Sequence, residues 1–462
     1  MGPQHGPPPQ GGPKAQPFHA QAFHAQAFHA QSFHAQSFHA QVEMQLEGEM
    51  PKWGPSILII SLDTVNAETL ALYGGIAQTP NIAKIAARGV LVEQAISHFP
   101  ETCLSHWSML SGVLPEVHGN APAHRGSIYA GPTLVEIAGS AGYRSGAIIG
   151  GITLQDQACG LGRAFDHYDD RVPNNPQDFT RPAPQVTENA VAWIQQRPGP
   201  YVAFVHYFDA HFPYTPKAEY AGMYGTGYSG PLTGSDADLR PFRDGGKTPT
   251  AEELAHIHSL YAAEITQLDA ALGPLLDAVD PNNTIVVITA DHGESFGHDY
   301  WFNHREGLWD QVIRVPLIVA GPGFESGVRI LEQVGLIDMA PTVLAAAGLP
   351  TDTGMMGTDF RTQGQAGEVT SITDPWREQS SMAVRNAALK VLITPTRQLG
   401  YDLVQDPDEL KPFEMKSLDE RALIYGQILE RYAPRQVSAP TAAPIDPQRV
   451  EQLKSLGYIA PE

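Results

Sequence analysis

The stretch Ser-Ile-Leu-Ile-Ile-Ser-Leu, residues 56–62, is a largely apolar run that ends directly at Asp63. Two runs of the same kind are Tyr201–Tyr207 (YVAFVHY) and Thr284–Thr289 (TIVVIT), and an aspartate follows each within two residues, Asp209 and Asp291. Short apolar runs without alternation are typical of strands buried on both faces. The sequence therefore predicts three central strands, each with a carboxylate at its carboxyl end.

Helical patterns alternate with these strands along the chain. They cover residues 79–89, 133–142 and 251–278, and two more apolar runs, residues 145–149 and 315–319, are further candidate strands. Such alternation predicts the α/β class, with a large, mostly parallel sheet sandwiched by helices. Ligands in these folds bind at the carboxyl ends of the strands, so we expect Asp63, Asp209 and Asp291 to lie at one edge of the sheet.

The chain divides into three segments by composition. Residues 1–50 contain Phe-His-Ala-Gln-x repeated five times, a period that fits neither a helix nor a strand, and we predict a disordered low-complexity tail whose histidines could hold a metal loosely. We predict a catalytic domain over residues 51–370. Residues 371–462 are more polar, with a Pro/Ala-rich stretch at 433–447, and we predict a small C-terminal α+β subdomain there.

Charge and apolar content exclude several classes of partner. The net charge is −21, with 29 basic and 50 acidic residues, which argues against nucleic acid as the main partner. The apolar runs are too short for a membrane span, which needs about 20 residues. Residues 1–12 have no secretion-signal pattern, so we expect a cytoplasmic protein. The two cysteines, Cys103 and Cys159, could form one disulfide, and the sequence alone does not decide whether they do.

Two segments carry candidate chemistry. Thr102 and Cys103 precede a short amphipathic pattern that ends at Gly112, and a helix N-terminus there would favour an oxyanion or a deprotonated nucleophile. Thr102 could equally be a simple helix cap. Asp291 and His292 follow a strand, and with Asp63 they fit one divalent cation, Mg, Mn, Ca or Zn, with the imidazole favouring Mn or Zn.

The order of these motifs along the chain resembles the sulfatase branch of the alkaline phosphatase superfamily. The matching pieces are IISLDTV at 59–65, TPNI at 79–82, residues 102–112 with Pro115 and His118-Gly119, ADHGE at 290–294, IRVPLI at 313–318, IDMAPT at 337–342 and LKSLGY at 453–458. The resemblance implies an alkaline phosphatase-like fold and a metal held by Asp63, Asp291, His292 and Thr102.

The departures from the sulfatase pattern are also informative. In sulfatases a cysteine in Cys-x-Pro/Ala-x-Arg becomes formylglycine, whereas the alignment puts Thr102 at that position, as in phosphatase, phosphodiesterase and phosphotransferase relatives. Cys103 is the less favoured candidate for the nucleophile. His106 stands where the family has its Arg, and we expect it to contact the bound anion. Thr64 replaces the family's second Asp.

Two more histidines belong to the resemblance. His211 looks like the histidine that contacts the anion, and His304 like the residue that meets the leaving group, although His298 competes for that role. The two-zinc form of the superfamily needs an Asp-x-x-x-His cluster, but Pro213 lies four residues after Asp209. The second zinc is therefore not supported.

These features together predict a metal-dependent hydrolase of sulfate or phosphate esters with Thr102 as nucleophile. The expected substrate is a small-molecule, glycan or lipid ester. The alternatives are a phospho-group transferase, in which a second alcohol replaces water, and a non-catalytic binding protein that retains the fold. The absence of the formylglycine motif favours phosphate over sulfate, and bound metal would favour an enzyme over a binding protein.

Overall fold

The computed structural model describes residues 54–119, 131–173, 180–196, 199–298, 300–351, 354–362, 368–373 and 380–414. The chain divides into two units, residues 1–50 and 51–462, and all described residues belong to the second. The expected repeat tail, the Pro/Ala-rich stretch at 433–447 and the motif at 453–458 lie outside the described residues.

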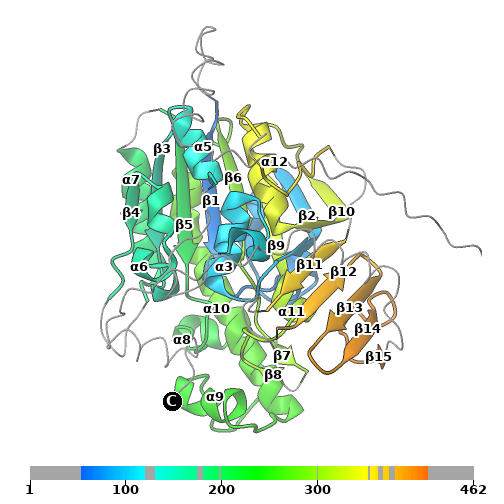
Figure 1. Cartoon of the computed structure of the whole chain (residues 1–462). Helices are drawn as coiled ribbons and strands as arrows, with labels where there is room; N and C mark the ends of the chain where they lie inside the picture. Colours follow the sequence, from blue (N-terminus) through cyan, green and yellow to red (C-terminus); the bar gives the residue numbers. More distant parts are fainter. Residues whose placement is uncertain are drawn as a thin grey trace, which may run out of the picture. The chain divides into compact units, whose positions relative to one another are not determined.

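A sheet of eight strands forms the centre of the second unit (Figure 1). Its spatial order is β10 (Val328–Gly335), β2 (Gly89–Ile96), β9 (Arg314–Ala320), β6 (Thr284–Thr289), β1 (Ser56–Leu62), β5 (Tyr201–Tyr207), β3 (Arg144–Ile149) and β4 (His167–Asp169). All neighbouring strands pair in parallel except at β9, which runs antiparallel to both β2 and β6. The predicted mostly parallel sheet is confirmed.

Helices cover this sheet because its central strands must be shielded on both faces. Every residue of β1, β5 and β6 is buried, and successive side chains of a strand point to opposite faces. One group of helices, α3 (Thr102–Ser111), α5 (Leu134–Ser140) and α12 (Met339–Ala346), lies over the face turned to the viewer in Figure 1. A second group that packs together comprises α2 (Pro80–Ala86), α7 (Ala183–Gln195) and α10 (Ala251–Asp277).

Local sequence signals fix where the helices begin. Thr133 and Glu136 form a capping box at α5, and Thr250 and Glu253 form another at α10, so orphan backbone N–H groups gain partners at both starts. The predicted helices at 79–89, 133–142 and 251–278 are observed. The short helices are α4 (Pro115–His118), α6 (Asp156–Cys159), α8 (Ala218–Ala221), α9 (Asp236–Arg243), α11 (Asp310–Ile313) and the 3₁₀ turns at 67–69, 71–73, 152–154, 161–164 and 336–338.

A second, antiparallel sheet follows the central one in sequence. Its strands are β11 (Val369–Ile372), β12 (Met382–Arg385), β13 (Leu389–Ile393), β14 (Gln398–Asp402) and β15 (Phe413–Glu414), and β7 (Phe296–Gly297) pairs with β8 (Tyr300–Trp301) separately. The predicted fold class, including a C-terminal subdomain, is thereby confirmed.

Buried ions and backbone bonds attach the antiparallel sheet to the rest of the unit. Lys390 is fully buried, and its Nζ lies 2.6 Å from carboxylate oxygens of both Asp310 and Glu409. The backbone N–H of Ile372 in β11 donates to the carbonyl of His98 at 3.0 Å. The sheet is therefore bonded to the segment that leads into α3. Within the described residues, no helix is long and apolar enough to cross a membrane.

Candidate active site

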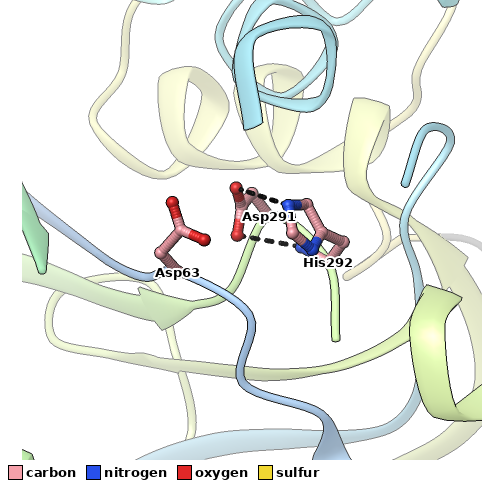
Figure 2. A group of neighbouring side chains, drawn as sticks. All are labelled: Asp63, Asp291 and His292. Atoms are coloured by element: carbon pink, nitrogen blue, oxygen red, sulfur yellow. Dashed lines mark hydrogen bonds and ion pairs between the residues drawn. The ribbon is translucent and has the colours of Figure 1, made fainter. Parts of the chain in front are cut away.

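The ends of two adjacent strands bring the predicted metal ligands together. β1 and β6 pair with Ser61 opposite Thr289, so Asp63 and Asp291, two residues beyond this pair, emerge side by side. Asp63, Asp291 and His292 each offer one ligand atom within 4.8 Å of the others, and Figure 2 shows Asp291 between the other two side chains. Asp209 follows β5 at the same edge of the sheet, as expected, but is not part of this group: its Oδ1 accepts from the backbone N–H of Ala183 at 2.9 Å.

The three ligand side chains have unsatisfied atoms that a cation would satisfy. All three are fully buried, yet Oδ1 of Asp63, Oδ2 of Asp291 and Nε2 of His292 have no hydrogen-bond partner among the described residues. The second polar atom of Asp291 and that of His292 already have backbone partners. Oδ1 of Asp291 accepts from the backbone N–H of His292, and Nδ1 of His292 donates to the carbonyl of Gly293, both at 3.0 Å. Buried polar atoms without partners are costly, so two carboxylate oxygens and an imidazole nitrogen fit a divalent cation.

The charges of the two carboxylates reinforce this reading. Burial, and then the neighbouring charge of Asp291, raise the pKa of Asp63 well above its usual value. For Asp291 burial acts in the same direction, but His292, His106 and His206 outweigh it and lower the pKa. Two buried carboxylates at such short range resist double ionisation, and a bound cation relieves that repulsion.

Thr102 is the first residue of α3 and lies beside this group. Its Oγ1 donates to Oδ2 of Asp63 at 3.4 Å, and the side chain is fully buried. The N-terminus of this ten-residue helix provides backbone N–H groups without intrahelical partners and the positive end of the helix dipole beside the Thr102 hydroxyl. The hydroxyl is therefore next to both a candidate cation and a helix end that favours negative charge.

His211 and His304 face one another across the same site. Their ring centroids are 5.6 Å apart, and the His304 ring stacks on His292 at 4.1 Å. Nδ1 of each donates to a backbone carbonyl, that of Phe212 at 2.9 Å and that of Pro100 at 2.7 Å, so Nε2 is the nitrogen that can take up a further proton. Burial lowers the pKa of His211 to about 3 and that of His304 well below its usual value.

Sequence comparison decides the family of this site. The Sulfatase family model matches residues 55–349, well over half of the chain. The chain belongs to the sulfatase family. This match confirms the predicted resemblance. It also agrees with the predicted class of enzyme, an ester hydrolase.

Individual relatives of this sulfatase-family chain are distant. Arylsulfatase K of Danio rerio is 34% identical over 116 residues, 23% of this chain and 21% of that protein, so the match spans about a fifth of the relative. A structure solved with its substrate D-glucosamine-2-N,6-O-disulfate has a TM-score of 0.67 at 17% identity, covering 83% of this chain and 99% of that one. The phosphonate monoester hydrolase of Agrobacterium radiobacter has the same score and identity, covering 83% and 96%. These structures show the fold.

His106, at the position of the sulfatase arginine, points into the protein. It is fully buried, its Nδ1 donates to the carbonyl of Thr102 at 2.6 Å, and its Nε2 accepts from the hydroxyl of Ser61 at 2.8 Å. Burial lowers its pKa to about 4, so the ring is neutral at pH 7. Since both ring nitrogens are engaged, this geometry leaves no donor for the anion contact expected of His106. The ring instead ties the first turn of α3 to β1.

The cysteine of the sulfatase-like segment is bonded. Cys103 forms a disulfide with Cys159, the pairing that the sequence left open. A sulfur in a disulfide offers no thiolate, which removes the alternative nucleophile in this oxidation state. Disulfides are typical of oxidising compartments, so this bond and the expected cytoplasmic location point in different directions, and the location stays a prediction.

Two residues of the site were missed in the sequence. Nε2 of His206 in β5 lies 3.1 Å from Oδ2 of Asp63, and Oε2 of Glu294 accepts from the hydroxyl of Tyr214 at 2.9 Å. Burial raises the pKa of Glu294 to about 8. A histidine inside the otherwise apolar YVAFVHY strand was a usable signal, because a buried polar side chain needs a partner. Glu294 lies in the recognised ADHGE motif but carried no assigned role.

Proposed function

We propose that this protein hydrolyses sulfate or phosphate-type esters with Thr102 as nucleophile beside one divalent cation held by Asp63, Asp291 and His292. The observation that carries the proposal is the convergence of three buried ligand atoms that lack hydrogen-bond partners among the described residues, next to the Thr102 hydroxyl at a helix N-terminus. Two of these atoms, Nε2 of His292 and Oδ2 of Asp291, lie 3.3 Å apart. The fold relatives support the same range of substrates, because one acts on a sulfated sugar and another on phosphonate monoesters.

The reaction begins with attack by Oγ1 of Thr102 on the sulfur or phosphorus, in line with the bond to the alcohol oxygen. A bound cation supplies positive charge that favours the alkoxide of Thr102 and stabilises the ester oxygens. The α3 N-terminus adds N–H groups toward the same charge. The hydroxyl of Thr102 gives up its proton to solvent, the bond from Oγ1 to the sulfur or phosphorus forms, and the bond to the alcohol oxygen breaks. Water then attacks the Thr102 ester, which restores the hydroxyl and releases the sulfate or phosphate group.

His304 or His211 protonates the departing alcohol oxygen through Nε2. Both rings are neutral without substrate, because burial lowers their pKa values. An anionic ester placed beside them raises these pKa values, since an opposite charge favours the protonated ring. The proton is then available only when substrate is present. We propose His211 also as a contact for the anionic oxygens.

The nature of the nucleophile favours phosphate-type esters over sulfate esters. A threonine cannot supply the aldehyde hydrate that the formylglycine of sulfatases provides, and the Cys103 sulfur is in a disulfide. We propose phosphate or phosphonate esters of a small-molecule, glycan or lipid alcohol as the first class to test. Transfer of the phospho group to a second alcohol is the variant of the same chemistry.

A paired hydrolysis assay tests the proposal. Nitrophenyl sulfate, phosphate, phosphate diester and phosphonate are each incubated with Mn²⁺ and with wild type, Thr102→Ala or Thr102→Ser. We expect cleavage of a phosphorus ester that Thr102→Ala abolishes and Thr102→Ser partly retains, because serine keeps the hydroxyl. Wild-type activity in Thr102→Ala would refute the nucleophile. Sulfate as the preferred substrate would refute the ranking of esters, and inactivity of a metal-loaded wild type on all four would favour the binding-protein alternative.

A further inference from the structure

Two buried imidazoles lie behind the candidate metal ligands. His206 in β5 and His106 in α3 are both fully buried, and their rings meet edge to face with centroids 5.3 Å apart. His106 has partners at both nitrogens. His206 contacts Asp63 through Nε2, and its Nδ1 has no hydrogen-bond partner in the part of the chain that the structure describes.

The bond between His206 and Asp63 has a defined direction. In the proposed metal site Asp63 is an ionised carboxylate, which only accepts, so we assign His206 as the donor, through Nε2–H to Oδ2 of Asp63. The same oxygen receives the hydroxyl of Thr102, whereas Oδ1 has no hydrogen-bond partner within the described ranges. The His206 imidazole thus occupies Oδ2 of Asp63 with a hydrogen bond, and Oδ1 is left for a cation. The β5 and β1 strands are paired with His206 opposite Ser61, so the position of the donor is fixed by the sheet.

The two metal-ligating carboxylates are held in different ways. Oδ1 of Asp291 accepts from two backbone N–H groups, those of Thr64 at 3.3 Å and His292 at 3.0 Å. In the described structure, the carboxylate of Asp63 has only two donors, the side chains of Thr102 and His206. The Thr102 hydroxyl must leave Asp63 when it attacks the substrate. His206 is then the donor that keeps Asp63 in place.

The environment of His206 argues against a purely structural reason for a histidine there. The residue lies among buried apolar neighbours in β5, and an unpartnered ring nitrogen in such a place costs stability. A phenylalanine would fill a similar volume without that cost, as Phe204 does two residues earlier on the same face. The interaction that distinguishes histidine from phenylalanine here is the bond to Asp63.

We propose that His206 is a positioning residue for the metal site, which orients Asp63 by holding Oδ2 and leaving Oδ1 for the cation. This inference rests on the proposed metal site and extends it to a residue that contacts neither cation nor substrate. Partners that orient a metal ligand commonly change metal affinity by about 10- to 100-fold when they are lost. The effect should therefore appear in cation binding itself, before any turnover.

Calorimetric titration of the full chain with Mn²⁺, after removal of bound metal by a chelator, tests this role. The variants are His206→Phe, which keeps a ring and removes the donor, and His206→Gln, whose side-chain amide can restore it. His258→Phe is the matched control, because that histidine also bonds a side chain, Thr69 Oγ1 at 3.1 Å, but does not contact a ligand. We expect about 10- to 100-fold weaker binding for His206→Phe, partial recovery for His206→Gln and no change for His258→Phe.

The outcomes separate this inference from the proposed function. A wild type that binds no divalent cation refutes the metal site itself. Tight binding by wild type and equally tight binding by a folded His206→Phe overturns the role of His206 alone, as does a glutamine variant no better than the phenylalanine one. Should His206→Phe fail to fold, His206→Asn replaces it. The asparagine amide is too short to restore the bond to Asp63, so this variant should bind Mn²⁺ more weakly than His206→Gln. Equal affinity of the two variants overturns the proposal.

Discussion

Removing the cation and removing one of its ligands should change stability in opposite directions. In the metal-free protein, Asp63 and Asp291 are buried like charges, and the pKa of Asp63 is raised well above its usual value. A cation at about 100 times its dissociation constant stabilises the folded state by about 2.7 kcal/mol. For a chain of this length that corresponds to a rise in Tm of roughly 5 °C, at about 2 °C per kcal/mol.

Asp63→Asn should make the metal-free protein more stable and abolish its response to metal. A carboxyl whose pKa is higher in the folded state destabilises the fold as the pH rises above its unfolded value of about 3.9. Asparagine carries no such penalty, so we expect a gain of about 0.5–2 kcal/mol at pH 7.5. The gain should shrink as the pH falls through 4.5 toward about 3.9, because the unfolded carboxyl then also begins to take up its proton.

Thermal unfolding followed by fluorescence measures both effects, with chelator or Mn²⁺ at the two pH values. Asp277→Asn serves as the control, because it removes the same charge from an exposed place at the end of α10. An equal rise in Tm with Mn²⁺ for wild type and Asp63→Asn would refute the assignment of Asp63 as a ligand. A metal-free Asp63→Asn less stable than wild type at pH 7.5 would refute the electrostatic argument.

Three further substitutions test other parts of the site and its support. His304→Ala should lower kcat by about 10²–10⁴ for an alkyl ester but little for a nitrophenyl ester, whose leaving oxygen needs no acid; equal losses for both would contradict its role as acid. Cys103→Ser, which removes the disulfide, should cost about 2–4 kcal/mol, and a reductant should lower the Tm of wild type but not of this variant. Lys390→Met leaves the buried carboxylate of Glu409 without a cation, whereas Asp310 keeps Arg385 at 2.7 Å. The substitution should cost about 3–5 kcal/mol in denaturant unfolding, and a loss below about 1 kcal/mol would show that water reaches Glu409.

The sequence predicted the elements whose signal is local and repeated. Apolar runs closed by aspartates identified β1, β5 and β6, and the ordered motifs predicted that Asp63, Asp291 and His292 lie together, as they do. The run at residues 315–319 was also recognised as a strand, but an apolar run carries no direction. That β9 is antiparallel to its neighbours follows from tertiary packing.

The features that the sequence did not predict depend on long-range contacts. Cys103 and Cys159 are 56 residues apart, and nothing local says that they meet. His106 aligned with an anion-binding position, yet its orientation in α3 is set by a bond to Ser61 in β1. His206 looked like part of an apolar run, because its partner Asp63 lies just beyond the neighbouring strand β1 and not in the adjacent sequence.

The attachment of β11 bears on where the working unit of this protein ends. The family match stops at residue 349, but β11 begins at Val369 and bonds to His98 through both its backbone and the His98 ring, whose Nδ1 lies 2.6 Å from the carbonyl of Thr370. His98 lies four residues before Thr102. A chain shortened to residue 349 would keep every proposed reactive group. It would lose β11, however, and with it the bonds to His98 that hold the segment leading to Thr102. The family match therefore ends before the structural unit does, and a shortened version of this protein should retain β11.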